Sequence, residues 1–422
     1  MVIMEDLPES ISPCSNVRKT CYSIMDDPSF EEDENGRSVI INDAALEKLG
    51  SKIANSILSQ PEGEQGDNGD DSSGIDCCIN NLQFAAWDEE DWHYTGENYD
   101  RSNVSREDVQ KQRFERVALY ILVMDCINFC FWPVADGKHK KNLLEYEHLA
   151  SALKILAEAD DKGDSSISHE GGGTVTRAED SYAFAPQNLI KLTNETFLEM
   201  MTPLLPKVPE NEDESTYTIP NVNERVRLLV EMGQSLLFSH DGSATQFIAK
   251  ANRSSDKLVF LILQSFPGFR DATVDSSRGR WVAFYKRAQI LVADLWAALG
   301  SEDGALKHGS NLCNYRDMDK ITTFADYRIP QLLRNMDVLN YSPALSHKVD
   351  ARLEIQSSSM EEIYIRASTV VAVDYLVKIV KDKAKKGGIN AVKMDWYLWN
   401  IGEKLDRNGC LGNHHLVNTI FY

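Results

Sequence analysis

Apolar residues recur along most of the chain with the period of an α-helix. In residues 288–299 they fall at i, i+3, i+4, i+7, i+8 and i+11, and residues 370–380 repeat a similar spacing. Such spacing predicts helices that bury one face in a core. Strand-like alternation is confined to residues 279–284 and 353–355, so we predict a mainly α protein with a single helical domain. Further helices are expected at residues 42–58, 224–237, 244–251, 256–265 and 330–339.

Residues with capping preferences mark some of the expected helix ends. Asn42 can cap a helix that begins after it, because its side chain accepts a hydrogen bond from a free backbone N–H. Pro330 suits the first position of a helix, where its missing N–H costs nothing. The lysines that precede Gly387 and Gly388 are typical of a helix C-terminus.

Residues 117–135, VALYILVMDCINFCFWPVA, are apolar over almost the length of a membrane span. A carboxylate at the centre of a bilayer costs about 2.5–3.5 kcal/mol, so Asp125 argues against insertion. We expect a helix buried in a soluble core, with no membrane association. In that setting Asp125 and Asn128 need polar partners. Cys126 and Cys130 are expected to be buried structural thiols.

The formal net charge of −21 is concentrated near the N-terminus. Residues 1–100 contain 23 acidic and 5 basic side chains, whereas the other 322 residues contain 42 and 39. We predict an acidic, partly disordered segment at residues 1–36 and a helical domain at residues 37–422. Acidic, Gly- or Ser-rich insertions are expected in that domain at about 60–75, 160–182 and 206–216. A nearly neutral body suits a small ligand better than a nucleic-acid polymer, so no stable nucleic-acid complex is expected.

The eight cysteines include no CxxC pair, which argues against structural zinc and thioredoxin-like chemistry. The N-terminus, MVIMEDLPES, is acidic where a secretory signal would be basic, and it has no apolar stretch. We expect a cytosolic protein, or one shared with the nucleus, that uses no metal and no cofactor.

No GxSxG, HExxH, GxGxxG or Walker motif is present, and the candidate chemistry lies in aromatic and charged clusters. Aromatic side chains beside carboxylates suit a pocket that holds a flat ring and stabilises a nearby cation. Taken singly, each cluster is better explained structurally: Asp326 would pair with Arg328, and Lys286 and Arg287 would cover a helix surface. The clusters are DWHYTG at 91–96, SFPGFRD at 265–271, FYKRAQILVADLW at 284–296, FADYRIPQ at 324–331 and DWYLWN at 395–400.

Together these clusters resemble the queuosine salvage proteins, which are queuosine 5′-phosphate N-glycosylase/hydrolases. The similar stretches also include MDCINFCFW at 124–132, ITTFADYRIPQLL at 321–333 and HHLVNTIFY at 414–422. Their order and spacing agree from about Val17 to Tyr422. The resemblance implies a helical catalytic domain related to the helix-hairpin-helix DNA glycosylases. It also implies release of queuine from queuosine 5′-monophosphate without a metal, so that the base can return to tRNA.

The resemblance assigns roles to particular residues. Asp326 matches the catalytic carboxylate, Lys286 a site lysine and Phe324 an aromatic residue that contacts the base. Asp395 falls where the family has an Asp that contacts the ligand. Trp396 replaces a Tyr, which keeps a stacking face and loses a hydroxyl.

Two further matches are less direct. Asn400 replaces an Asp and keeps an acceptor without the charge. His93 matches an N-terminal site histidine within a sequence that otherwise departs from the family.

These residue types agree with cleavage of an N-glycosidic bond. The sugar becomes cationic, and a buried carboxylate such as Asp326 stabilises it or activates the attacking water. Queuine is a 7-deazaguanine, so N7 cannot be protonated and Asp395 becomes a hydrogen-bond partner for another edge of the base. The 5′-phosphate needs cations or N–H donors, for which Lys286, Arg287 and the helix start at Pro330 are candidates.

Two alternatives remain open at this point. One is a glycosylase that acts on a nucleic-acid polymer, which the nearly neutral body disfavours. The other is a non-catalytic nucleotide-binding protein, which the departures at Trp396 and Asn400 favour.

Overall fold

The computed structural model describes ten stretches of the chain. The expected insertions at 60–75 and 206–216 lie outside them. The described stretches are residues 12–26, 38–59, 93–100, 104–132, 144–162, 166–168, 174–176, 182–205, 219–275 and 279–422.

Helices dominate the described residues, as predicted. The N-terminal half contains α1 (Pro13–Met25), α2 (Asp43–Ser59), α4 (Arg106–Ile127), α5 (Tyr146–Lys162), α6 (Pro186–Leu189) and α7 (Asn194–Met201). The central part contains α8 (Val222–Ser239), α9 (Ala244–Ala249), α10 (Ser255–Ser265), α11 (Lys286–Leu299) and α12 (Glu302–His308). The C-terminal part contains α13 (Arg328–Asn335), α14 (Pro343–Asp350), α15 (Met360–Ala384) and α16 (Ala391–Arg407). Three 3₁₀ turns lie at η2 (Thr202–Leu204), η3 (Pro267–Phe269) and η4 (Met318–Lys320).

The strands of the described residues form three antiparallel pairs. They are β1 (Val39–Ile41) with β6 (Leu339–Tyr341), β2 (Ser166–Ser168) with β3 (Thr174–Thr176), and β4 (Ala272–Asp275) with β5 (Arg280–Ala283). Only β5 falls on a predicted strand; at 353–355 the chain makes a single bridge, between Glu354 and Leu416.

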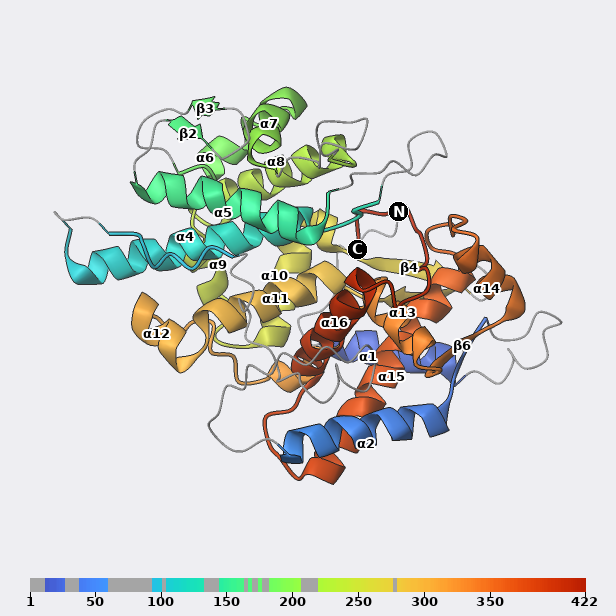
Figure 1. The fold of residues 1–422 in the computed structure, drawn as a ribbon. Coiled ribbons are helices and arrows are strands. Elements are labelled where there is room, and N and C mark those ends of the chain that lie inside the picture. Colours follow the sequence, from blue (N-terminus) through green and yellow to red (C-terminus); the bar gives the residue numbers. More distant parts are fainter. Residues whose placement is uncertain are drawn as a thin grey trace.

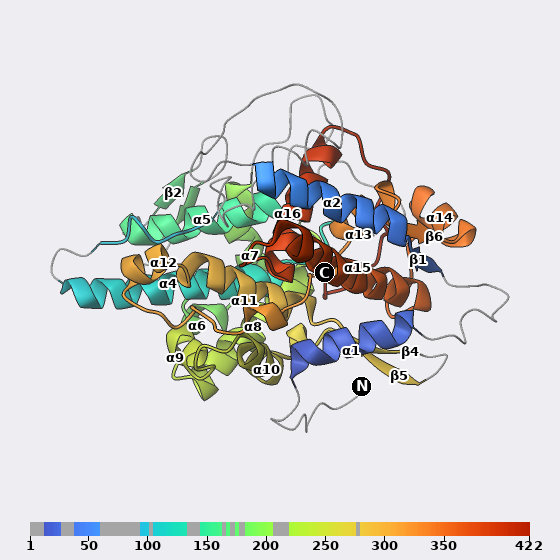
Figure 2. The same ribbon diagram turned by 90° about the horizontal axis from the view of Figure 1, so that it is seen from below.

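Two helices are buried on all sides and organise the core. Every residue of α4 from Val117 to Ile127 is buried, and so is every residue of α15 from Glu362 to Val373. Helix α4 packs against α5, α8, α9, α11 and α12, and α15 packs against α1, α2, α13 and α16. Figures 1 and 2 show these two groups of helices toward opposite ends of the molecule. Helix α11 of the first group and helix α16 of the second lie near the middle. A helix without a polar face belongs at the centre of such a packing.

The buried apolar helix is confirmed, but it ends earlier than predicted. Helix α4 stops at Ile127, and Cys130 adopts a positive φ of 46°. Buried Arg225 donates hydrogen bonds to the carbonyl oxygens of Ile127, Phe129 and Cys130. These donors pair the last carbonyl group of the helix and two carbonyl groups of the segment that follows it. Within the described residues no helix is long and apolar enough to cross a membrane.

Other helix ends also differ from the predictions. Helix α13 begins at Arg328, which makes Pro330 its third residue and not its first. Helix α15 ends at Ala384 with Lys385 as its left-handed cap, at φ 52°, before the two glycines. The predicted cap at Asn42 is confirmed, because its side chain accepts the N–H of Ala45 at 3.2 Å.

Two stretches expected to lie outside regular structure contain it. Residues 160–182 were expected as one loop, but α5 continues to Lys162 and the strands β2 and β3 pair within this range. Helix α1 lies before the boundary predicted at residue 36 and still packs against α15, with Val17 and Cys21 fully buried. Helix α1 contains no acidic residue, which distinguishes it from the acidic sequence on either side.

Candidate active site

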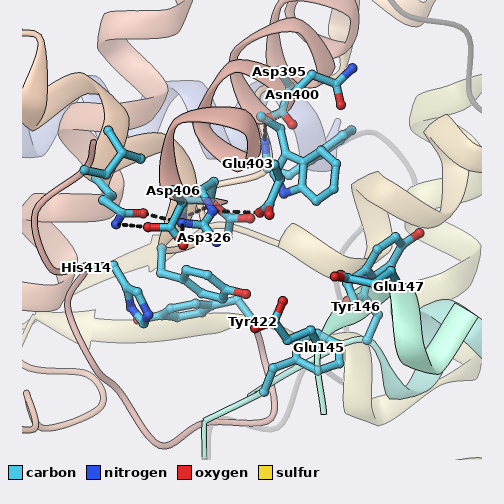
Figure 3. A pocket seen from close by; sticks show the side chains of 18 of the residues that line it. Glu145, Tyr146, Glu147, Asp326, Asp395, Asn400, Glu403, Asp406, His414 and Tyr422 are labelled. Carbon is cyan, nitrogen blue, oxygen red and sulfur yellow. Dashed lines mark hydrogen bonds and ion pairs between the residues drawn. The ribbon is translucent and has the colours of Figure 1, made fainter. Parts of the chain in front are cut away.

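A cavity of about 760 Å³ lies between the α4–α5 side of the molecule and α11, α13 and α16. All seven site residues predicted from the sequence line it. Figure 3 shows residues of α16 on one side of the cavity and the start of α5 on another. Its volume falls in the ordinary range for small-molecule sites. The seven residues are His93, Lys286, Phe324, Asp326, Asp395, Trp396 and Asn400.

The segment Ile321–Tyr327 enters the cavity without helix or strand structure, so side chains must hold it. Gln289 of α11 accepts the N–H of Thr322 at 2.9 Å and donates to its hydroxyl at 2.8 Å. Asp395 accepts from Thr323 and Phe324, and the guanidinium of Arg366 donates to the carbonyl oxygen of Ala325 at 3.0 Å. Four successive residues are therefore fixed before Asp326.

Asp326 lies at the start of α13 and is partly exposed to the cavity. Its Oδ1 accepts the backbone N–H groups of Arg328 at 3.0 Å and Ile329 at 3.3 Å. No described residue forms a hydrogen bond with its Oδ2. The alternative ion pair between Asp326 and Arg328 is not formed, because that guanidinium pairs with Glu403 at 2.7 Å and Asp406 at 2.9 Å.

Lys286 is the first residue of α11, and its side chain is buried in the cavity wall. Burial lowers its pKa, whereas the negative charges of Asp326, Asp125 and Asp395 act in the opposite direction. The residue before it, Tyr285, has a positive φ of 49°, which is unfavourable for a bulky side chain. Because the side chain of Lys286 is buried, the expectation that it covers a helix surface is wrong.

Asp395 belongs to α16 and is almost fully buried. Its Oδ2 accepts hydrogen bonds from the hydroxyl of Thr323 and from the N–H of Phe324, the latter at 2.7 Å. Burial raises the pKa of Asp395 well above its usual range, and the neighbouring charge of Asp326 adds to this effect. A carboxyl group in such surroundings holds its proton more tightly than one in water.

Aromatic side chains form much of the cavity wall. Phe324 is buried there by the fixed loop, and Trp399 lies one helical turn from Trp396 on α16. Trp396 is half-buried and stacks on Trp296, with ring centroids 6.1 Å apart and an interplanar angle of 14°. One face of the Trp396 indole is thus already used by the protein.

His93 lies across the cavity in a polar aromatic group. Its ring nitrogens are each 3.5 Å from a tyrosine hydroxyl, those of Tyr120 and Tyr146. Burial lowers the pKa of His93 to about 3, and Lys154 adds to the shift. The imidazole is therefore neutral and can offer one donor and one acceptor. Asn400, from α16, lines the same cavity.

Asp125 is fully buried on α4, and neither of its carboxylate oxygens has a hydrogen-bond partner among the described residues. Burial raises its pKa to about 7, although the charges of Lys286 and Arg287 oppose the shift. The sequence identified Asp125 as a polar group that needs a partner. In the structure the side chain of Asn128 and the cations of Lys286 and Arg287 are the neighbours that favour its ionised form.

The structure disfavours two of the three candidate phosphate contacts. Arg287 is buried outside the cavity and donates hydrogen bonds to the carbonyl oxygens of Asp125, Cys126 and Gly268. The start of α13 is already occupied by the carboxylate of Asp326. An anion in the substrate would be repelled there.

Sequence reasoning also missed residues of this cavity. Glu403 and Arg328 form an ion pair in its wall, and Tyr422 reaches it from the C-terminal segment. The spacing on α16 could have revealed Glu403, because positions 396, 399, 400 and 403 lie on one face of a helix. Within the described ranges no three His, Cys, Asp or Glu side chains are arranged to hold a metal ion.

The fold and the cavity define a helical protein with a nucleotide-sized site that combines carboxylates, a lysine and aromatic rings. The sequence model described as queuosine salvage protein matches residues 108–171 and 173–422. The chain therefore belongs to the queuosine salvage protein family, as its motifs indicated.

Curated relatives support the same assignment. A protein of Dictyostelium discoideum is 36% identical over 311 residues, which cover 73% of this chain and 79% of the relative. A protein of Sphaerobacter thermophilus is 33% identical over 313 residues, with 73% and 82% covered. A protein of Bos taurus is 32% identical over 323 residues, with 73% and 82% covered. All three are named queuosine 5′-phosphate N-glycosylase/hydrolase.

Proposed function

We propose that this protein is an N-glycosidase that hydrolyses queuosine 5′-monophosphate and releases queuine for return to tRNA. The observation that carries the proposal is the convergence of the seven predicted residues on one cavity. The names of the relatives support the reaction and the substrate.

Asp326 would act on the sugar. Cleavage of the glycosidic bond develops positive charge at the anomeric carbon, which a fixed carboxylate stabilises. The two N–H groups on its Oδ1 orient the carboxylate, and Oδ2 is then the oxygen that faces the sugar or accepts a proton from the attacking water.

Asp395 would act on the departing base. Because a 7-deazaguanine lacks N7, negative charge that develops on the base must be neutralised at another edge. Burial raises the pKa of Asp395, so this group holds a proton more tightly than a carboxyl group in water and can donate a hydrogen bond or a proton there. Two carboxyl groups in different surroundings are a common basis for acid and base roles in one site.

Lys286 would act on both carboxyl groups. Its ammonium lies among the charges of Asp326, Asp395 and Asp125, whose negative charge it offsets. We assign the contact with the sugar to Asp326, which is partly exposed, and the contact with the base to the more deeply buried Asp395.

The remaining predicted residues would bind the base. Phe324 and the free face of Trp396 offer stacking surfaces for a flat ring. Asn400 offers a donor and an acceptor for its polar edges, and His93 would contact the base through its ring, beside Tyr146. Asn400 is uncharged where the family has an Asp, so its contact with the base would depend on hydrogen bonding alone.

The 5′-phosphate would lie at the outer part of the cavity. Arg352 and Lys404 line it, and neither forms an ion pair with another described residue. Arg352 donates only to Asn413, at 3.3 Å, which leaves further N–H groups for an anion. By contrast, Arg328 is already bound by Glu403, Asp406 and Gln331.

We also propose a relation to the helix-hairpin-helix DNA glycosylases and a cytosolic or nuclear location. Stable binding to tRNA or DNA is not part of the proposal, because residues 101–422 carry 42 acidic and 39 basic side chains.

The test is chromatography of the base released from queuosine 5′-monophosphate by the purified full chain. Wild-type protein should release queuine, and Asp326→Asn should slow release by about 10³-fold or more. Asp319→Asn, at an exposed carboxylate close by in sequence, is the control and should remain active. Full activity of Asp326→Asn would exclude that residue, and no release by wild type would exclude the function.

A further inference from the structure

Asp271 and Arg366 form a buried ion pair behind the cavity. Both residues are 2% exposed, and neither lines the cavity. The contact is bidentate: Nη1 of Arg366 lies 2.9 Å from Oδ1 of Asp271, and Nη2 contacts Oδ2. Removing two charges from water is unfavourable, so a buried pair alone is a weak source of stability. Each partner, however, makes a further contact that leads to a cavity residue.

Asp271 holds the turn that begins α11. Its Oδ2 accepts the backbone N–H of Lys286 at 3.0 Å, and its carbonyl oxygen accepts those of Phe284 and Tyr285, both at 3.0 Å. Tyr285 has a positive φ and makes no side-chain cap. Strained backbone of this kind persists only where neighbouring contacts determine it. Asp271 supplies those contacts, and Lys286 follows directly from the turn.

Arg366 holds the loop that carries Asp326. Its Nε donates to the carbonyl oxygen of Ala325 at 3.0 Å, one residue before Asp326. The guanidinium lies over two rings, 4.0 Å from the centroid of Phe284 and 4.4 Å from that of Tyr422. Both rings restrict the position of the guanidinium, and Tyr422 itself lines the cavity.

We infer that the Asp271–Arg366 pair is a positioning clamp, which sets the place of Lys286 relative to Asp326. Asp271 holds the backbone of the Lys286 segment. Arg366 holds the carbonyl oxygen of Ala325 at the opposite end of the bidentate contact while it packs on the rings of Phe284 and Tyr422. This inference rests on the proposed function, because it assigns Asp326 and Lys286 to the reaction. A displacement of about 1 Å in a reacting group can lower a rate by about 10²-fold.

A second ion pair, between a half-buried arginine and a buried aspartate, provides a control. Arg116 and Asp161 lie 2.8 Å apart, with Asp161 also bound by the hydroxyl of Tyr94. Arg116 stacks on the ring of Tyr182 at 3.9 Å. Neither Arg116 nor Asp161 lines the cavity. Like the clamp, this pair joins an arginine that packs on an aromatic ring to a buried aspartate, although both Arg116 nitrogens contact the same oxygen of Asp161. It lacks the links of the clamp to Lys286 and Asp326.

The test compares Arg366→Lys and Asp271→Asn with Arg116→Lys and Asp161→Asn in the full chain. Release of queuine and the melting temperature are measured for each. The clamp variants should lower kcat by about 10²-fold with KM within about twofold of wild type. The control variants should lower the melting temperature by a similar amount and leave kcat unchanged. Equal kcat losses in both sets, or a rise in KM without a fall in kcat, would overturn the clamp.

A double variant keeps the inference testable if Arg366→Lys fails to fold. In a Lys286→Met background, Asp271→Asn should lower kcat much less than it does in wild type, because its target is already absent. Full additivity of the two losses would contradict a role through Lys286. Inactive wild type would instead refute the proposed function, so the two failures are distinguishable.

Discussion

The floor and the rim of the cavity are built differently. We define the floor as Lys286, Asp326 and Asp395, and the rim as Arg352, Lys404 and Asn413. Lys286 and Asp395 are buried. The carboxyl groups of Asp326 and Asp395 accept backbone N–H groups at 2.7–3.3 Å, and the backbone N–H of Lys286 donates to Asp271 at 3.0 Å. At the rim, Lys404 is exposed and Arg352 half-buried, and one described hydrogen bond of 3.3 Å joins Arg352 to Asn413.

This difference separates two roles. A floor group held by several bonds is positioned before substrate arrives, which is what stabilisation of a transition state requires. A rim group with few bonds can adjust to a ligand and contribute binding energy in ground state and transition state alike. Floor variants should therefore change kcat, and rim variants should change KM.

Lys286→Met should give the largest effect of the four substitutions considered next. Removing the ammonium leaves the negative charges of Asp326, Asp395 and Asp125 without the cation of Lys286 that offsets them. We expect kcat to fall by about 10³-fold. Single-turnover release of queuine measures this, with a thermal melt to establish folding. A loss smaller than threefold would remove Lys286 from the mechanism.

Asp395→Asn should have a smaller effect on the same step. The amide oxygen can still accept from Thr323 and Phe324, so the loop remains in place. The amide nitrogen donates a hydrogen bond but transfers no proton, and we expect kcat to fall by about 10²-fold. Steady-state release assays measure the change. An unchanged kcat would show that the base departs without help from Asp395.

Arg352→Gln tests the rim. Loss of a charge-assisted contact with phosphate should raise KM for queuosine 5′-monophosphate by about tenfold and leave kcat unchanged. KM for the nucleoside queuosine should not change. Arg227→Gln, at a surface arginine of α8 paired with Glu224 and Glu231, is the control. Equal increases of KM for both substrates would place the phosphate elsewhere.

Asp125→Asn should have the smallest effect, visible in the pH dependence of stability. Burial raises the pKa of Asp125 to about 7, from about 3.9 in an unfolded chain, so the folded state binds this proton more tightly. That contribution is complete below about pH 4 and is lost as the pH rises through about 7. The variant should lose less melting temperature than wild type between about pH 4 and 8. Identical profiles would contradict the shift.

The sequence was sufficient for the helices and for the floor. Helical periodicity marked α2, α8, α10, α11 and α15, because each buries a stripe of apolar side chains in the core. The floor residues lie in short clusters whose residue types and order identify the family. These residues lie on a loop and at helix starts that periodicity does not place. Their meeting in one site was implied by the family resemblance.

The rest depends on contacts between distant parts of the chain. Arg287 looked like a partner of Lys286, but adjacent helical residues point in different directions, and Arg287 binds the end of α4. Asp271 and Arg366 are 95 residues apart, so no local spacing connects them. Pro330 does not mark the start of α13, because the helix begins two residues earlier. Its first backbone N–H groups donate to the carboxylate of Asp326.

The central claim is that this cavity cleaves a small nucleotide, and one measurement tests it most directly. Wild-type protein is incubated in parallel with queuosine 5′-monophosphate, queuosine and queuosine-containing tRNA, and free queuine is quantified by chromatography. We predict release from the monophosphate, slower release from the nucleoside and none from intact tRNA. Binding of the monophosphate, seen as a rise in melting temperature without any released base, would contradict the claim.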